Sequence, residues 1–215
     1  MVKLFLCILL LAHIPTTLIG REWFVELAPS QIKVCSSSSL RTPSWFMKTY
    51  GAENMINLSF FTHRSYVPPY KDHQTSNYRN TKKWPFVALS HDDITFHDPR
   101  DLTYAEYESL CDNSVYIMSG FPLLLEAGVK TKLSKSAFTK RRCARTVLAL
   151  HSNGSVIIYV TDRASLSEVQ ETLLAYGCTD AINFDGGSST FLYLKGKRVY
   201  ATHSGSSYPN VLYWD

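Results

Sequence analysis

The residues with the clearest capacity for chemistry lie in one stretch near the C-terminus. Asn183 and Asp185 are two positions apart in a short apolar run, so in a strand their side chains share one face. Gly186 and Gly187 follow directly, and glycines turn the backbone while leaving its amide N–H groups open to a close ligand. Three hydroxyl residues come next, Ser188, Ser189 and Thr190. This order predicts a site for an anion or a sugar at a strand end.

A predicted helix positions this stretch. Ser165-Leu166-Ser167-Glu168 has the pattern of a capping box, and Gly177 closes the helix that it begins. A helix that leads into a strand ending in Asp and glycines is the usual place for a ligand in a mixed α/β sheet. An isolated Asp-Gly pair would instead indicate an ordinary hairpin turn.

Polar residues also interrupt or end other predicted strands. Asn57 lies in the apolar segment 54–61, where a buried amide needs a partner in either a neighbouring loop or a ligand. Arg145 lies in the apolar segment 143–150, and a half-buried guanidinium there calls for a carboxylate or a phosphate. The other candidates at strand ends are Ser119, Gly120, Thr146, Asp162 and Arg163.

One further candidate, His203, lies in the polar Gly/Ser-rich segment 202–208. It is a candidate proton donor, although a single histidine in such a loop is more often simply solvated. The Tyr-rich segment 63–83 is predicted to be a long surface excursion, and loops of this length are either mobile or form the rim of a site. As a rim it would set the specificity of the site.

Turn signals between apolar runs predict the fold class. Asn153-Gly154 separates two long apolar strands, and similar hairpins are expected at Asp92-Asp93 and Lys195-Gly196. Strand 23–27 is expected to pair with strand 31–35. Together these signals predict an α+β fold with a mixed, largely antiparallel β-sheet core and a few flanking helices.

The predicted helices have recognisable ends. A second capping box at Thr103-Tyr104-Ala105-Glu106 begins a short helix that runs to Leu110. Another short helix is expected after Ser44 as its N-cap, with Gly51 just beyond its end.

Length and charge restrict the class of protein. The 215 residues, 45% of them hydrophobic, suit one well-buried domain, which we place at residues 21–215. The formal net charge is only +4, and the basic residues are scattered apart from Lys140-Arg141-Arg142. Because no basic stripe alternates with aromatic residues, we expect no nucleic-acid partner.

The N-terminus has the pattern of a targeting segment. Lys3 precedes an apolar run from Leu4 to Ile14, which predicts a signal peptide over residues 1–20, with an uncleaved anchor as the alternative. The run is too short for a confident membrane span, so no stable span is expected after signal removal. We therefore expect a secreted, lumenal or periplasmic protein.

Cysteine usage agrees with export. Outside the targeting segment the even number of cysteines allows two disulfides in three pairings among Cys35, Cys111, Cys143 and Cys178. No Cys-x-x-Cys or His-x-x-x-His spacing suggests zinc, so neither a metal nor a cofactor is expected.

The candidate segments, in their order and approximate spacing, resemble those of the phosphodiester glycosidase family. The segments are Asn57 before Phe60-Phe61, Ser119-Gly120 before Pro122-Leu123-Leu124, Arg145-Thr146, Asp162-Arg163 and Asn183-Phe184-Asp185-Gly186-Gly187-Ser188-Ser189-Thr190. The resemblance extends from about Asn54 to the C-terminus, and its most specific part is the last segment. This chain has two glycines in that turn where the family has three.

The resemblance implies hydrolysis of a sugar-1-phosphodiester at the anomeric carbon. Asp185 would be the carboxylate at that carbon and Arg145 the phosphate clamp, with Asp162 and Arg163 as second candidates and His203 as a proton donor. The remaining candidates would bind substrate oxygens: Asn57, Ser119, Gly120, Thr146, Asn183, Gly186, Gly187, Ser188, Ser189 and Thr190. The alternative is a carbohydrate- or glycophosphate-binding protein without turnover. A serine hydrolase is disfavoured, because no Gly-x-Ser-x-Gly elbow precedes a helix.

Overall fold

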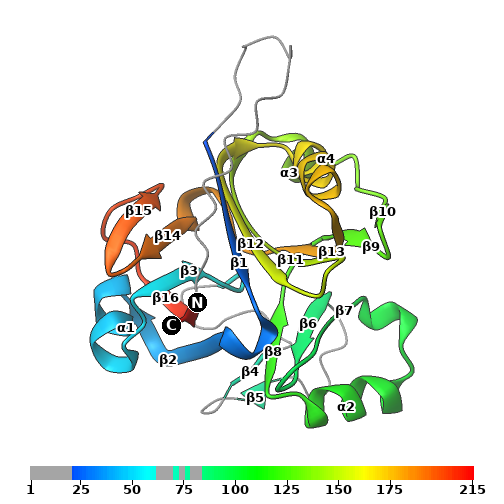
Figure 1. Ribbon diagram of the computed structural model, residues 1–215, viewed down its shortest axis with the longest axis horizontal. Coiled ribbons are helices and arrows are strands. Elements are labelled where there is room, and N and C mark those ends of the chain that lie inside the picture. The colour runs from blue at the N-terminus through cyan, green and yellow to red at the C-terminus, as the bar shows by residue number, and fades with distance from the viewer. Residues whose placement is uncertain (1–20, 62–69, 73–75, 78–83) are drawn as a thin grey trace.

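The computed structural model describes residues 21–61, 70–72, 76–77 and 84–215. The predicted targeting segment 1–20 and most of the predicted excursion 63–83 lie outside them. The described strands form three sheets in which neighbouring strands are antiparallel, and four α-helices accompany them, so the predicted α+β class is confirmed (Figure 1). No helix in the described part of the chain is long and apolar enough to cross a membrane.

The largest sheet has six strands in the order β1-β12-β11-β13-β9-β10. The predicted Asn153-Gly154 hairpin joins its two longest strands, and Gly154 takes a φ of 87° that glycine adopts without strain. The strands are β1 (Glu22–Leu27), β9 (Leu123–Glu126), β10 (Val129–Lys130), β11 (Cys143–His151), β12 (Val156–Ala164) and β13 (Cys178–Asn183).

Two five-stranded sheets complete the fold, in the orders β15-β14-β3-β16-β2 and β5-β4-β8-β6-β7. The first consists of β2 (Lys33–Arg41), β3 (Asn54–Asn57), β14 (Phe191–Leu194), β15 (Lys197–Ala201) and β16 (Tyr208–Trp214). The second consists of β4 (Tyr70–Lys71), β5 (Ser76–Asn77), β6 (Phe86–Leu89), β7 (Ile94–His97) and β8 (Tyr116–Ser119). The hairpins predicted at Asp92-Asp93 and Lys195-Gly196 are confirmed.

The expected pairing of strand 23–27 with strand 31–35 is wrong. β1 pairs with β12, and β2 pairs with β16, in two different sheets. The 3-10 turn η1 (Pro29–Gln31) redirects the chain between them. Both strands still contribute to one shared core, so apolar alternation alone did not reveal the partner of either.

The four helices are α1 (Pro43–Tyr50), α2 (Tyr104–Asn113), α3 (Ala137–Lys140) and α4 (Leu166–Tyr176). Both predicted capping boxes are confirmed, at the starts of α2 and α4. Helix α1 is capped at Thr42 rather than at the predicted Ser44, because Pro43 fits the first helical position. Gly51 ends it in the left-handed conformation, as predicted.

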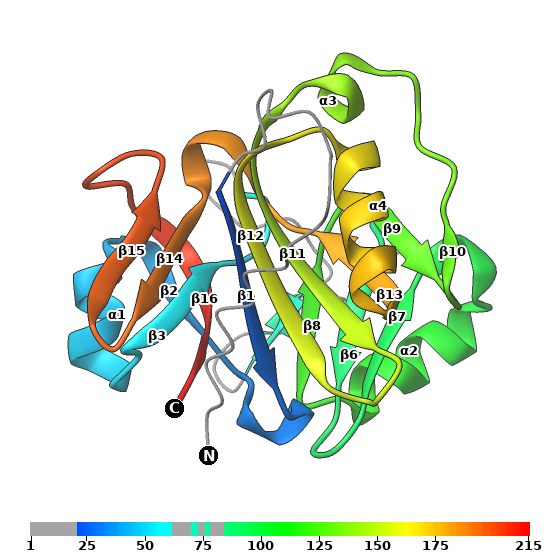
Figure 2. The ribbon, with the colours of Figure 1, turned by 45° about the horizontal axis from the view of Figure 1, so that its top comes forward.

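The central core lies between the three sheets. One large buried cluster draws residues from all of them, including Leu148 and Ile182, Ile56 and Leu212, and Val87. Each sheet buries its other face under a helix: α4 packs on the six-stranded sheet, α1 on the sheet of β2 and β3, and α2 on that of β6 and β8 (Figures 1 and 2).

The expected disulfides are absent from the structure. The four cysteines at 35, 111, 143 and 178 are all free thiols. Cys35, Cys111 and Cys178 lie in three different core clusters, under α1, in α2 and under α4 respectively. Burial raises the pKa of Cys111 and of Cys178 to about 12, so these thiols stay protonated at neutral pH.

Gly120 lies where two sheets meet, after β8. A Cβ at this position would be 2.7 Å from the Asn183 carbonyl oxygen and 2.8 Å from Cγ1 of Ile182. We expect Gly120→Ala to lower the free energy of unfolding by about 3 kcal/mol, because a backbone group cannot give way cheaply. Urea denaturation measures the change. Gly128→Ala is the control: its Cβ meets nothing within 4 Å, and it should lose only about 1 kcal/mol through its left-handed backbone.

Candidate functional site

The sheet register brings three of the predicted strand ends together. Val147 is paired with Asn183, so continuing this register by two residues puts Arg145 opposite Asp185. Arg145 is paired on its other side with Thr161, next to Asp162. Asp185, Arg145 and Asp162 therefore lie at the same end of the six-stranded sheet. Asp162 is two strand spacings from position 185, about 10 Å.

The turn after β13 is bonded to two sheets. The Phe184 amide N–H donates to the Thr146 carbonyl at 2.8 Å, within the six-stranded sheet. One residue later, the Asp185 amide N–H donates to the Leu58 carbonyl at 3.1 Å, just beyond β3. The chain then enters the 3-10 turn η3 (Gly187–Ser189) and β14. The Asp185 backbone is thus fixed where the two sheets join.

Asn57 completes this junction. Its side-chain amide donates to the Asp185 carbonyl, and its Oδ1 accepts from Thr146 Oγ1 at 2.8 Å and from the Phe191 amide at 3.1 Å. The side chain is buried and all of these partners are protein groups. The sequence left two possible partners for Asn57, a neighbouring loop or a ligand, and in the structure its side chain is bonded to the neighbouring turn. The Thr146 hydroxyl is part of the same hydrogen-bond network.

The Asp185 carboxyl group is partly buried and held in place. Its Oδ1 accepts from the Gly186 amide at 2.9 Å, and Ser189 donates a side-chain hydrogen bond to it. Burial disfavours the charged form and raises the pKa of Asp185 from 3.8 to about 6, although both hydrogen bonds act in the opposite direction. A carboxyl group that ionises near pH 6 is suited to proton transfer or charge stabilisation at physiological pH.

This raised pKa predicts a pH-dependent stability. The folded protein binds the Asp185 proton more tightly than the unfolded chain, so stability falls as pH rises from 3.8 to about 6 and then stays level. We expect Asp185→Asn, which removes this titration, to gain up to about 3 kcal/mol relative to wild type between pH 4 and pH 7. Urea denaturation at the two pH values measures the gain. Asp92→Asn, in an exposed turn, should show no gain.

Gly186 allows this arrangement by having no side chain. A Cβ there would be 2.8 Å from the Ala144 carbonyl oxygen and 3.7 Å from the Arg145 Cα. The glycine predicted to allow close approach of a ligand is thus required for close packing of the turn on β11. Its neighbour Gly187 has a φ of 59° and open space around it, and the next residue, Ser188, is exposed.

The Arg145 guanidinium is buried and bonded to backbone carbonyl groups. Nε donates to the Ala164 carbonyl at 3.2 Å, and Nη2 donates to those of Phe138 at 3.0 Å and Arg141 at 2.7 Å. The partner expected from the sequence was a carboxylate or a phosphate, whereas these partners are uncharged. The guanidinium also lies over the Phe138 ring, 5.2 Å from its centroid. Burial lowers the pKa of Arg145.

Asn183 links the turn to the segment after β8. The Asn183 side-chain nitrogen Nδ2 donates to the Phe121 backbone carbonyl at 2.7 Å, and the Asn183 backbone carbonyl accepts from the Phe121 backbone amide at 2.7 Å. Gly120 packs on the same Asn183 carbonyl, and Ser119 is buried beside it at the end of β8. The structure therefore brings together Ser119, Gly120 and Asn183, as the sequence predicted.

Buried polar atoms without hydrogen-bond partners gather around the turn. Within the described residues they are Ser59 Oγ, Asn183 Oδ1, Thr190 Oγ1 and both polar atoms of the Asn210 amide. Asn183 and Thr190 flank the Asp185 turn. Ser59 follows Leu58, whose carbonyl group accepts the amide hydrogen of Asp185. Buried polar groups are normally paired, and these atoms are shielded from solvent, so in this arrangement a buried water would be the partner of each.

The other three candidates are paired with another residue or exposed to solvent. The Asp162 carboxylate forms an ion pair with Arg21 at 3.1 Å, and Arg163 is exposed on β12. His203 is exposed in the loop before β16. That loop is tied to the turn by Thr202, whose Oγ1 donates to the Gly187 carbonyl at 2.7 Å. The catalytic roles assigned to these residues stay predictions.

The sequence analysis did not single out several residues near the candidate site. Tyr208 lies near the Asp185 carboxyl group, and burial raises the pKa of this tyrosine to about 12. Four aromatic rings, each in contact with two of the others, form a closed group: Phe60, Trp84, Phe121 and Phe138. Phe60 and Phe121 belong to motifs that were identified, but an aromatic residue beside a strand end is indistinguishable in sequence from core.

The described residues contain no group of three or more His, Cys, Asp or Glu side chains that could hold a metal ion.

Known structures share this fold. A protein from Synechocystis matches with a TM-score of 0.73 and 14% identity over 89% of this chain, which spans 58% of that protein's length. The catalytic domain of zebrafish N-acetylglucosamine-1-phosphodiester alpha-N-acetylglucosaminidase, autoinhibited by its pro-peptide, matches with a TM-score of 0.68 and 15% identity. That match covers 93% of this chain and 84% of the zebrafish chain. At these identities the likeness concerns the fold alone. No curated protein sequence matches the chain.

The family follows from a sequence match. Residues 50–213 match the model of the phosphodiester glycosidase family. The matched range covers most of the chain and includes all of the candidate site residues. The chain therefore belongs to the phosphodiester glycosidase family, and the resemblance drawn from its motifs is confirmed.

Proposed function

We propose that this protein hydrolyses sugar-1-phosphodiesters at the anomeric carbon, releasing a free sugar and a phosphomonoester. The observation that carries the proposal is the Asp185 carboxyl group, partly buried at the junction of two sheets, with a pKa raised to about 6. Membership of the phosphodiester glycosidase family supports the same reaction.

Asp185 would act on the reacting sugar. When the bond to the phosphate breaks, positive charge develops at the anomeric carbon, and a nearby carboxylate stabilises that charge or activates water. Partial burial strengthens this interaction, because little water screens the carboxylate. The hydrogen bonds from Gly186 and Ser189 keep its oxygen atoms in a fixed direction.

The phosphate needs donors but little acid catalysis, because a phosphate is a good leaving group. Two of the three guanidinium nitrogens of Arg145 are bonded to carbonyl groups, which leaves Nη1 as the nitrogen for a phosphate oxygen. The exposed hydroxyl of Ser188 and the backbone of Gly187 would complete the binding of polar oxygens. Asn183 and Thr190 are completely buried, so they would support the turn rather than contact the sugar.

The test is release of free sugar from a panel of sugar-1-phosphodiesters that includes UDP-N-acetylglucosamine and methyl-phospho-N-acetylglucosamine. We expect turnover of at least one. Saturable binding without turnover of any member would instead support the carbohydrate- or glycophosphate-binding alternative, which the shorter glycine turn permits.

We also propose that the protein acts outside the cytoplasm. The support is the apolar run of residues 4–14 behind Lys3, the pattern of a signal peptide. The test is N-terminal sequencing of the protein from the medium, or from a lumenal or periplasmic fraction, and of the cytoplasmic protein. Removal of the signal peptide would give the two forms different N-terminal residues.

A further inference from the structure

The hairpin between β11 and β12 carries a sequence motif that the proposed reaction does not use. Asn153-Gly154-Ser155 has the Asn-x-Ser pattern of an acceptor for an N-linked glycan, in which x is any residue except proline. The sequence has one other such pattern, Asn57-Leu58-Ser59. Because an N-linked glycan is bulky and polar, only an asparagine at the surface can carry one in a folded protein. The structure therefore decides between the two motifs.

Asn57 has no room for a glycan. Its side chain is 1% exposed, and its Nδ2 donates to the Asp185 carbonyl inside the junction of two sheets. Ser59, the hydroxyl residue of the same motif, is 2% exposed. A sugar on Nδ2 of Asn57 would have to enter the core between β3 and the Asp185 turn. A chain modified there could not reach this fold.

Asn153, in contrast, is exposed at the tip of its hairpin. Backbone hydrogen bonds close the turn: the Gly154 amide donates to the His151 carbonyl at 2.8 Å, and the His151 amide donates to the Ser155 carbonyl at 2.8 Å. The Asn153 Oδ1 accepts from the Ser155 amide at 2.9 Å and lies 2.7 Å from the Ser155 hydroxyl. The side-chain amide and the hydroxyl group of the motif thus lie together at the surface.

The contact between Asn153 and strand β1 is compatible with a glycan. Asn153 Nδ2 donates to Oε1 of Glu26 at 3.2 Å, and the Ser155 hydroxyl lies 2.7 Å from the same oxygen. The hydrogen bonds from Ser155 and Asn153 lower the pKa of Glu26, which is therefore a carboxylate at neutral pH. A side-chain amide nitrogen carries two hydrogen atoms, and glycosylation replaces one of them. The other can still donate to Glu26.

We propose that Asn153 carries an N-linked glycan in the exported protein. The sugar donor would be a polyprenyl-diphosphate-linked oligosaccharide, transferred by an oligosaccharyltransferase. A bond forms between Nδ2 and the anomeric carbon, and the bond from that carbon to the diphosphate breaks. The diphosphate leaves with the bonding electrons, and one amide proton passes to a base of the transferase. The inference rests on the proposed export and is independent of the proposed hydrolysis.

The glycan would lie far from the candidate site. Arg145 and Leu150, which are paired with Thr161 and Val156, are five residues apart on β11. The hairpin end of this strand is therefore about 17 Å from Arg145, whereas Asp185 lies at the Arg145 end. Removal of the glycan should then leave the rate of sugar release unchanged.

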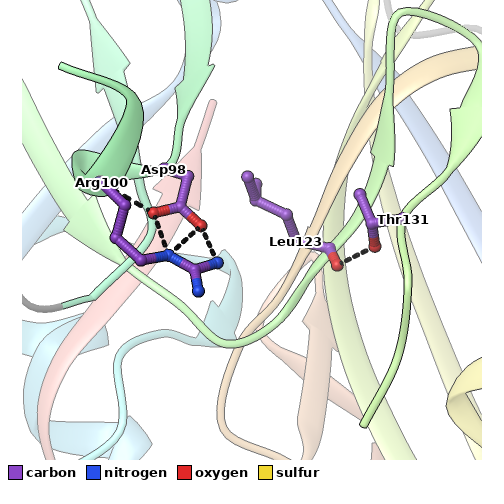
Figure 3. A network of polar contacts seen from close by, with 4 residues as sticks. All are labelled: Asp98, Arg100, Leu123 and Thr131. Atoms are coloured by element: carbon purple, nitrogen blue, oxygen red, sulfur yellow. Dashed lines mark hydrogen bonds and ion pairs between the residues drawn. The ribbon is translucent and has the colours of Figure 1, made fainter.

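A second exposed loop offers a matched reporter of contact with the transferase. Ser134→Asn creates an Asn-x-Ser pattern with Lys135 and Ser136, all exposed. This loop is anchored at its start, because the Thr131 hydroxyl donates to the Leu123 carbonyl (Figure 3). A chain that receives a glycan at position 134 has met the transferase.

The test is to produce the full chain in a eukaryotic secretory host and to treat the exported protein with a peptide N-glycosidase. We expect the treatment to remove one glycan and to convert Asn153 to Asp, which peptide mass spectrometry detects. Asn153→Gln and Ser155→Ala should each abolish the change in electrophoretic mobility. Ser59→Ala is the control that removes the buried motif, and it should keep the glycan. Ser134→Asn should carry two glycans.

A glycan at position 134 of Ser134→Asn, in a chain whose Asn153 is unmodified, would overturn the assignment. A glycan on Asn57 of the folded protein would overturn the structural argument as well. If neither position 134 nor Asn153 is modified, the inference fails together with the proposed export to such a compartment. Sugar release by wild type and Asn153→Gln, measured on the same preparations, reports separately on the proposed hydrolysis.

Discussion

Asp185→Asn should lower kcat for sugar-1-phosphodiester hydrolysis by about 10³-fold or more, while the protein stays folded. Asparagine has the same shape and can still accept the Gly186 amide hydrogen, so the turn should persist. What is lost is the negative charge beside the carbon that becomes positive in the transition state. Initial rates of sugar release, with circular dichroism as the check on folding, measure the effect.

The pH profile sharpens this test. If the carboxylate is the active form, the wild-type rate should rise with pH up to about 6, following the raised pKa of Asp185. The matched control is Asp162→Asn, at the same end of the sheet but paired with Arg21, and it should cost about tenfold or less. Wild-type rates in a folded Asp185→Asn protein would refute the assignment of Asp185.

Arg145→Lys should lower the free energy of unfolding by about 3 kcal/mol, even though the positive charge is kept. The guanidinium donates from Nε and Nη2 to three carbonyl groups that lie in different directions. One ammonium group cannot reach all of them, so buried carbonyl oxygens would lose their partners. Urea denaturation measures the loss.

Arg163→Lys is the control for this substitution, because Arg163 is an exposed arginine on the neighbouring strand β12. Its stability should change by less than about 0.5 kcal/mol. If Arg145→Lys were as stable as wild type and only bound phosphodiesters more weakly, Arg145 would be a phosphate clamp with no structural role. Loss of both stability and activity would mean that the Arg145 guanidinium has two roles, with Nε and Nη2 bonded to backbone carbonyl groups and Nη1 bound to the phosphate.

The sequence predicted the class of fold and much of the local structure, because these depend on short-range rules. Capping boxes, turn glycines and apolar alternation located α2, α4, the β11–β12 hairpin and the strand that ends at Asp185. Strand partners were harder. β1 and β2 are adjacent in sequence and equally apolar, and only the long-range packing of three sheets decides that each joins a different one.

The candidate site, like the fold, was predicted from the sequence only in part. Asn183, Asp185, Gly186 and Gly120 were found because unusual residue types stand at strand ends, and the register does bring them together. The partners of Arg145 were not predicted, because backbone carbonyl groups leave no signature in a sequence. The disulfides were expected from an even cysteine count, which cannot reveal that three of the thiols lie in separate clusters.

The bonds that tie the Asp185 turn to two sheets also determine how a ligand would meet it. The Phe184 and Asp185 amides are hydrogen-bonded to two different sheets, so opening the turn breaks hydrogen bonds to both. Its local opening free energy should then approach that of global unfolding, and a ligand would find the turn already formed. Binding at this position would proceed by docking onto a rigid surface, and any slow conformational step in the reaction would have to arise elsewhere in the chain.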